Sequence, residues 1–216
     1  MGGLALPSRA ARADTFAFAG GHTSVHFTWS HAGLSRHWGR IIGATGSLEF
    51  DPLNVGLSKL DVRLKAEDIS TGVAALDRLL RSPDFFNVAQ YPNITFRATA
   101  VQATGERKGD VTGDLTIAGI TKPVTLHVTW NFSGAHPLGL VNPSFTGKYM
   151  AAFSATAQLR RSDWGLGRGA PLISDEIELR IETEMVRTKI SEPLAPVDAP
   201  QPLPIDPSSP QPVPQK

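Results

Sequence analysis

Residues 94–100, Ile-Thr-Phe-Arg-Ala-Thr-Ala, alternate apolar and polar side chains. This period of two predicts a β-strand with one buried face and one face in water. The buried face would carry Ile94 and Phe96, followed by the small side chains of Ala98 and Ala100. Packed sheets normally place large side chains at such positions, so this strand favours a barrel with a hollow interior.

The same alternation extends outward to residues 60–65, 124–130 and 177–184. Turn residues such as Gly20-Gly21 and Ala118-Gly119 separate these stretches from shorter candidates. The shorter candidate strands are Thr15–Ala19, Ser24–Ser30, Ile41–Phe50, Gly109–Ile117 and Ala151–Leu159. A count of eight or nine strands fits both a sandwich and a barrel. The small residues Ala155 and Ala157 on another inward face favour the barrel, and eight strands leave room for about one ligand.

Residues 73–81 predict the only helix, because Leu76 and Leu80 lie four positions apart on one face. Ser70 or Thr71 is expected to cap its first turn. Two phenylalanines follow the helix. A short helix near the mouth would give the barrel a cover. The predicted fold is therefore an all-β, eight-stranded antiparallel barrel with one short helix near its mouth.

Composition excludes several classes of protein. The chain has 216 residues, 41% of them apolar, a formal net charge of +1 and no cysteine. A net charge this small gives no general attraction to nucleic acid or to an anionic membrane, and the missing cysteines exclude disulfides and thiolate chemistry. No stretch reaches the roughly 20 apolar residues of a membrane-spanning helix. Nucleic acid and a transmembrane span are therefore not expected.

Three segments are expected along the chain. Residues 1–13 end in Ala11-Arg12-Ala13, which has the small-x-small form of a signal-peptidase site and predicts the rest of a signal peptide or a leader. Residues 14–190 hold all the strand signals and predict the barrel. Residues 191–216 are rich in proline and predict a disordered tail. With a signal peptide, the protein would be periplasmic or secreted.

Histidines crowd the first predicted strand and the loop after it, at positions 22, 26, 31 and 37. Histidine is a common metal ligand, so a metal-dependent hydrolase or isomerase is the alternative function. The spacing argues against it, because His22 and His26 on one strand would lie about 13 Å apart at roughly 3.3 Å per residue. No nucleophile or phosphate-binding motif is present. We therefore expect neither catalytic residues nor a metal site.

Arginines gather on the helix, at Arg78 and Arg81, and on the loop before the last strand, at residues 160, 161 and 168. A guanidinium suits phosphate and other anions. These side chains would form a cationic rim if both segments lie at one mouth. An ordinary solvated helix face and loop is the alternative explanation.

Taken in order, the motifs resemble the YceI-like family, whose members are exported lipocalin-like barrels associated with polyisoprenoid binding. The likeness runs from about Asp14 to Val186 without large gaps. The stretches that carry it are His22–Phe27, Gly46–Asp51, Asp77–Phe86, Gly113–Val124 and Arg161–Gly165. One difference is that the helix is apolar at Val73 and Leu79, where many relatives are more polar.

The resemblance implies a carrier or storage protein whose barrel holds a long lipid, such as a polyisoprenoid or an isoprenoid quinone. It implies no other cofactor, and it leaves the oligomeric state open, with a homodimer as one alternative. Arg78 and Arg81 are the residues expected at a lipid head group. The side chains expected to contact the apolar chain are Val25, Phe27, Leu76, Leu80, Phe85, Phe86, Phe96, Phe153, Trp164, Ile177 and Leu179.

Overall fold

The computed structural model describes residues 13–190, which form nine strands, one α-helix and five short 3₁₀ helices. The expected tail, residues 191–216, and all but the last residue of the expected leader lie outside the described residues. The strands are β1 (Asp14–His31), β2 (Ser35–Ile42), β3 (Thr45–Phe50), β4 (Lys59–Lys65), β5 (Asn93–Gly105), β6 (Lys108–Ile117), β7 (Ile120–Ala135), β8 (Tyr149–Arg160) and β9 (Glu176–Lys189). The helices are α1 (Ala74–Arg81), η1 (Val55–Leu57), η2 (Ala66–Asp68), η3 (Pro137–Leu140), η4 (Pro143–Phe145) and η5 (Arg161–Trp164).

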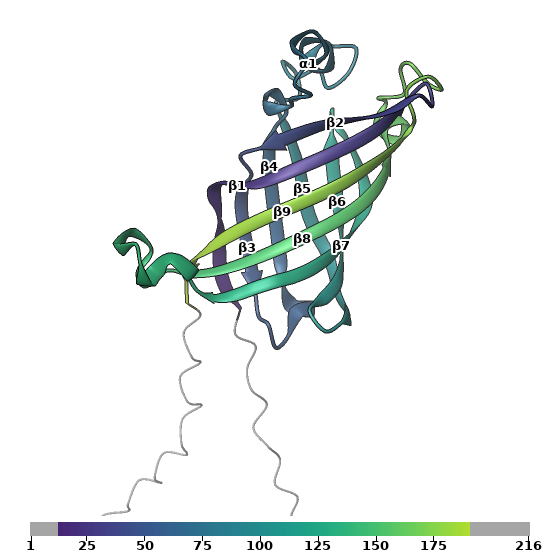
Figure 1. Ribbon diagram of the computed structural model, residues 1–216. Helices are drawn as coiled ribbons and strands as arrows, with labels where there is room; N and C mark the ends of the chain where they lie inside the picture. Colours follow the sequence, from purple (N-terminus) through teal and green to yellow (C-terminus); the bar gives the residue numbers. More distant parts are fainter. Residues whose placement is uncertain (1–12, 191–216) are drawn as a thin grey trace, which may run out of the picture. The chain divides into compact units, whose positions relative to one another are not determined.

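The strands close into a barrel because β1 has neighbours on both sides. From β3 to β9, each strand pairs antiparallel with the next, and β9 pairs with β1. On its other side β1 pairs with β2 through residues 24–31 and with β3 through residues 14–17. Strands β2 and β3 therefore share one position in the sheet. The result is the predicted eight-stranded antiparallel barrel (Figure 1).

The two ends of the barrel differ. The α1 end carries helix α1, the β1–β2 hairpin and the connections from β6 to β7 and from β8 to β9 (Figure 1). The β5–β6 end carries the β3–β4 loop, the tight turn between β5 and β6, and the β7–β8 connection. Strands that alternate in direction place these connections at the two opposite ends of the barrel.

Buried apolar side chains form two clusters, one toward each end. The cluster toward the α1 end includes Ile69, Trp164 and Leu166, and the cluster toward the β5–β6 end includes Phe16 and Met185. Both clusters consist of inward-facing side chains and of connections that fold over the mouths. They stabilise the wall of the barrel and leave its centre for the site described next.

Candidate functional site

The barrel encloses a cavity of about 910 Å³ whose lining extends from one end to the other. Every strand contributes to the wall through its inward-facing side chains. The eleven residues predicted to contact an apolar chain all lie on this wall: Val25, Phe27, Leu76, Leu80, Phe85, Phe86, Phe96, Phe153, Trp164, Ile177 and Leu179. The structure thus brings together side chains from early, middle and late parts of the sequence around one apolar space.

Two glycines give room to aromatic rings on the wall. Gly39 lies opposite Phe27 in the β1–β2 register, and a Cβ atom at Gly39 would come within 2.1 Å of the Phe27 ring. A Cβ atom at Gly113 would come within 2.5 Å of the Phe96 ring. Real Cβ atoms cannot approach so closely. Both rings can therefore occupy their places only because the neighbouring strand carries no side chain there.

The four alanines predicted on inward faces have different positions. Ala155 lines the cavity, while Ala98 and Ala157 pack in the core of the wall. The prediction for Ala100 is wrong. The β5–β6 register shifts between Ala98 and Ala100, so Ala100 is exposed and Val101 faces the cavity instead. Such an irregularity adds one residue to a strand and reverses which later positions point inward.

Helix α1 and the turn after it cover the cavity at the α1 end. The backbone N–H of Phe86 donates to the carbonyl of Leu80 over 2.9 Å, and that of Phe85 donates to Ser82 over 3.0 Å. These bonds fold the chain back against the helix. The predicted location of a short helix at one mouth is confirmed, and the side chains that it and the turn contribute are Val73, Leu76, Leu79, Leu80, Phe85 and Phe86.

The predicted cap of α1 is replaced by another arrangement. The helix begins after Val73, and neither Ser70 nor Thr71 caps it. Both hydroxyls donate to the carboxylate of Asp77 instead, Thr71 over 2.7 Å and Ser70 over 3.4 Å, and the Thr71 N–H adds a third bond of 2.6 Å. The hydrogen bond from the Thr71 hydroxyl is the largest cause that holds the pKa of Asp77 below its usual value.

The two arginines predicted for a head group are not part of the cavity lining. Arg78 is exposed on α1. Arg81 is half-buried, and its Nη2 donates to the carbonyl of Ile69 over 2.7 Å, which ties the helix to the segment before it. Contact of Arg78 or Arg81 with a head group stays a prediction, and the geometry gives Arg81 a tethering role.

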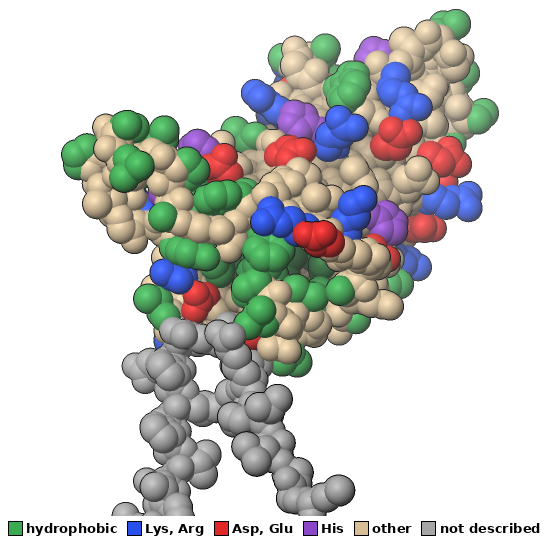
Figure 2. Space-filling model, turned by 60° about the horizontal axis from the view of Figure 1, so that its bottom comes forward, with side chains coloured by type: hydrophobic (Ala, Val, Ile, Leu, Met, Phe, Trp, Pro, Cys, Tyr) green, Lys and Arg blue, Asp and Glu red, His purple; other side chains and the backbone are tan. Residues whose placement is uncertain are grey.

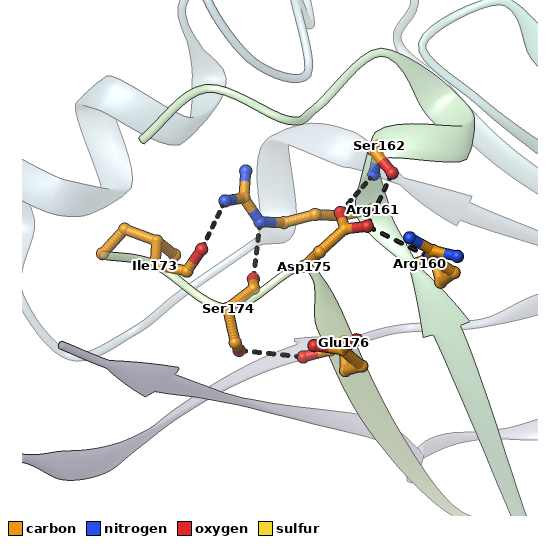
Figure 3. A network of polar contacts seen from close by, with 7 residues as sticks. All are labelled: Arg160, Arg161, Ser162, Ile173, Ser174, Asp175 and Glu176. Atoms are coloured by element: carbon orange, nitrogen blue, oxygen red, sulfur yellow. Dashed lines mark hydrogen bonds and ion pairs between the residues drawn. The ribbon is translucent and has the colours of Figure 1, made fainter. Parts of the chain in front are cut away.

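Two arginines of the predicted rim, Arg161 and Arg168, line the cavity at the α1 end. Arg161 is only 9% exposed. Burial lowers its pKa, and the nearby negative charge of Asp175 opposes this effect. Its guanidinium donates to four main-chain carbonyls in the loop before β9, and Figure 3 shows the bonds to Ile173 and Ser174. The acceptors are Ser174 at 2.8 Å, Ile173 at 2.8 Å, Arg168 at 2.9 Å and Leu166.

Asp175 fixes the other side of this loop (Figure 3). Its carboxylate accepts bonds from the N–H and the hydroxyl of Ser162, at 2.8 and 2.7 Å, and from Nε of Arg160 at 3.3 Å. The Ser162 hydroxyl is the largest cause that lowers the pKa of Asp175. The predicted cationic rim is thus largely engaged in holding the loop, so the polar groups of this end stabilise the mouth.

The four histidines of the alternative metal site are spread over three places. His22 lies 3.1 Å from a carboxylate oxygen of Glu184, and His26 alternates with cavity-facing residues and so points outward. His31 and His37 line the cavity at the α1 end, with their ring centroids 5.6 Å apart. Within residues 13–190, no three His, Cys, Asp or Glu side chains are grouped closely enough to hold a metal ion.

A row of rings that sequence reasoning missed leads into the cavity at the α1 end. Phe27 stacks on Trp29 at 5.7 Å between ring centroids, and Trp29 stacks on His37 of β2 at 5.6 Å. Trp29 and His37 both line the cavity. The alternation that places Phe27 inward also places Trp29 and His31 inward, so this signal was present in the sequence.

The mouth at the β5–β6 end was also not predicted. Its lining includes Leu53, Gly105, Arg107 and Lys108. The Arg107 guanidinium lies over the ring of Trp130, 5.1 Å from its centroid, and Trp130 faces the cavity. A turn signal in the sequence does not reveal at which end of a barrel the turn lies. This end therefore presents two cations beside an apolar interior.

Within the described residues, no helix has the length and apolar character needed to cross a membrane.

Comparison with known proteins agrees with the fold. Residues 16–185 match the family described as YceI-like domain. A UPF0312 protein of Pseudomonas savastanoi pv. phaseolicola is 38% identical over 170 residues, which cover 79% of this chain and 84% of that protein. The YceI protein of Campylobacter jejuni has a TM-score of 0.64 at 28% identity, covering 72% of this chain and 88% of that one. A polyisoprenoid binding domain from Saccharophagus degradans has a TM-score of 0.57 at 14% identity, covering 80% and 98%.

Proposed function

Because this chain belongs to the YceI-like family and has the barrel of that family, we propose that its cavity binds one long-chain apolar lipid. The observation that carries the proposal is the continuous apolar lining between the two ends of the barrel. Its volume of about 910 Å³ falls within the roughly 300–1,000 Å³ typical of ligand sites.

The shape of the lining favours a chain over a compact molecule. Phe85 covers one end of the cavity and Leu53 borders the other, so an occupant that fills the space spans the barrel. Burial of apolar surface contributes about 25 cal/mol per Å², which allows a chain of several isoprene units to bind without polar contacts. A polyisoprenoid and an isoprenoid quinone both meet these requirements. The Saccharophagus domain supports only the fold at its 14% identity, so the proposal rests on the cavity.

The geometry favours binding over a metal-dependent hydrolase or isomerase. The histidines that would serve such an enzyme point to different places, and the two on the wall, His31 and His37, belong to an aromatic row. The polar groups at the same mouth, Arg161 and Asp175, are engaged with main-chain atoms and with Ser162. A role as carrier or storage protein fits this arrangement.

Organic extraction of the native protein followed by mass spectrometry tests the proposal directly, and a long-chain lipid is the expected product. Titration with a fluorescent fatty acid gives the matching affinity. Ala155→Phe would place a ring in the cavity and should reduce both signals severalfold. Thr156→Phe is the matched control, because the neighbouring position is exposed on the outer face and should leave both signals unchanged. A protein without extractable lipid and without a saturable probe site would contradict the proposal.

Export is proposed with this function, since a carrier of such lipids would work between membranes. The support is the sequence Ala11-Arg12-Ala13. N-terminal sequencing of the protein from its native host should give Asp14 as the first residue. A cytoplasmic protein that retains residues 1–13 would overturn this part.

A further inference from the structure

The connection between β7 and β8, residues 136–148, projects from the barrel as a separate lobe, here called the β7–β8 lobe (Figure 1). It contains the two short helices η3 and η4. Its outer surface is apolar: Leu140 is 98% exposed, Val141 78% and Leu138 49%. Figure 2 shows the apolar side chains gathered on this projection. Soluble proteins rarely place several neighbouring large apolar side chains in water without a partner for them.

The β7–β8 lobe is held in shape by its own contacts. The rings of His136 and Phe145 stack with their centroids 4.1 Å apart, and Nζ of Lys148 lies 5.4 Å from the Phe145 ring centroid. The Asn142 N–H donates to the Leu138 carbonyl over 2.9 Å. Internal contacts of this kind fix the backbone, so the apolar tip is presented to solvent by a formed structure.

Three cationic side chains lie at this end of the barrel. Arg107 and Lys108 border the cavity mouth, and Lys148 lies at the base of the β7–β8 lobe. No carboxylate within residues 13–190 comes within ion-pair distance of these three side chains. Glu106 is the one acidic residue in the β5–β6 turn, and residues 136–148 include no Asp or Glu.

The mouth and the β7–β8 lobe are joined through β7. The backbone N–H of Trp130 donates to the Arg107 carbonyl over 2.8 Å, and Nη1 of Arg107 donates to the Asn131 carbonyl over 3.1 Å. From Asn131, β7 continues directly to Ala135 and into the β7–β8 lobe. The lobe and the cationic turn therefore lie at the same end of the barrel, on a continuous path of backbone.

The α1 end also exposes apolar side chains, such as Leu34 at 86%, but two of the cations that flank its mouth are paired. Arg36 lies 2.6 Å from Glu178, and Arg168 lies 2.5 Å from Asp84. The β5–β6 end instead places three cations that have no ion-pair partner among residues 13–190 near one apolar lobe, and this favours it for contact with an anionic surface.

We propose that the β5–β6 end docks on an anionic lipid bilayer, with Leu138, Leu140 and Val141 inserted among the lipids and Arg107, Lys108 and Lys148 against their head groups. Apolar insertion and attraction to anionic lipids add together in interfacial binding. Docking in this orientation turns the cavity mouth toward the bilayer, where a lipid can enter. The proposal rests on the proposed function for its purpose, while its geometry stands on the β7–β8 lobe and the cations.

Sedimentation with lipid vesicles tests the docking. The full chain should bind vesicles that contain phosphatidylglycerol more tightly than pure phosphatidylcholine vesicles, and added salt should weaken this binding. Leu140→Asp should weaken binding roughly tenfold or more, since burying one leucine contributes at least that factor. Leu34→Asp makes the same change at a similarly exposed leucine of the α1 end and should have no effect. Lys108→Glu should reduce only the preference for the anionic vesicles.

A second measurement separates docking from lipid binding. Transfer of a fluorescent fatty acid from vesicles to the protein should slow in Leu140→Asp, while the affinity for the same fatty acid added from solution stays unchanged. If the unmodified chain has no affinity for the fatty acid added from solution, that result counts against the proposed function alone. The docking proposal is overturned if the unmodified chain ignores anionic vesicles, or if Leu34→Asp weakens vesicle binding as much as Leu140→Asp.

Discussion

Arg161 shows at the scale of one residue how this protein holds a cation beside an apolar cavity. Its guanidinium is almost fully buried and satisfies four main-chain carbonyls of the loop before β9. A carbonyl that loses its partner in such a place keeps the cost of its lost hydration. The side chain therefore holds the loop over the mouth, and its role is structural rather than a contact with a ligand head group.

Arg161→Lys should destabilise the fold by about 2–4 kcal/mol. The four carbonyls surround the planar guanidinium, and the single ammonium group of a lysine would leave at least two of them without a hydrogen bond. Urea unfolding gives the free energy. Arg160→Lys is the control, since Arg160 is exposed and its ion pair with Asp175 should contribute less than about 1 kcal/mol. Equal losses in both variants would show that the four carbonyl contacts do not matter.

Asp77 links stability to pH. Hydrogen bonds, chiefly from the Thr71 hydroxyl, lower its pKa in the folded protein below the unfolded value of about 3.9. The contribution is therefore fully present above the unfolded pKa and is lost as pH falls through the folded pKa. Asp77→Asn should cost about 1 kcal/mol at neutral pH, and its difference from the unmodified chain should shrink below pH of about 4. Unfolding curves at several pH values measure this, with the exposed Asp68→Asn as control. A difference that does not change with pH would refute the assignment.

At the scale of the element, α1 acts as a cover rather than as part of the barrel wall. It contributes Leu76, Leu79 and Leu80 to the cavity, while its attachment depends on polar bonds such as that from Arg81 to Ile69. An element joined to the wall in this way opens more easily than a strand. A lipid that fills the cavity would add apolar contacts beneath the helix.

Phe86→Ala should therefore weaken lipid affinity more than it weakens the fold. Phe86 is half-buried on the cavity wall, so part of the roughly 3–5 kcal/mol typical of a buried phenylalanine should appear as lost binding. Phe16→Ala is the matched control, because Phe16 is 2% exposed in the core and is not part of the cavity lining. It should lose stability and keep its affinity. Fluorescent fatty-acid titration beside urea unfolding measures both quantities, and unchanged affinity in Phe86→Ala would make the helix a plug without ligand contact.

The strands could be predicted where alternation alone decides them, as in β4 and β9. The predicted turn at Gly20-Gly21 is wrong, because β1 continues through it with a register shift between Phe18 and Thr23. The expected strand Ile41–Phe50 is two strands, and the prediction missed all of β2 before Ile41. Its residues Ser35–Arg40 show no clear period, and pairing with β1 places them in the sheet. Where the local sequence does not indicate a strand, pairing with a neighbouring strand therefore decides whether the segment forms one.

At the scale of the whole molecule, the barrel depends on pairing between the two ends of the described chain. Thr15 of β1 pairs with Lys189 of β9, and the cavity exists only after this closure. Sequence patterns predicted the wall residues of the cavity, since inward positions follow from the strand period. They did not predict the mouth at the β5–β6 end or the β7–β8 lobe. Side-chain stacking within a connection leaves no periodic pattern in the sequence, and neither does the end of the barrel from which the connection projects. The lobe's apolar stretch Leu138–Val141 lacked a strand or helix period to mark it.

Removal of the bound lipid should lower the melting temperature of the whole domain. A ligand that binds only the folded state stabilises it by about 2.7 kcal/mol at one hundred times its dissociation constant. For a chain of this size that free energy corresponds to roughly 5–10 °C. The reason lies in the cavity of about 910 Å³, whose apolar wall has no contacts across the space until a ligand fills it. Thermal unfolding before and after delipidation measures the change, and a saturating fatty acid should restore the original melting temperature.

In Ala155→Phe the added ring occupies part of the cavity, so delipidation should change the melting temperature of this variant less than that of Thr156→Phe. An unmodified protein whose melting temperature is the same with and without lipid would show that the occupant contributes nothing to the folded state, and a stable lipid carrier could not behave in that way.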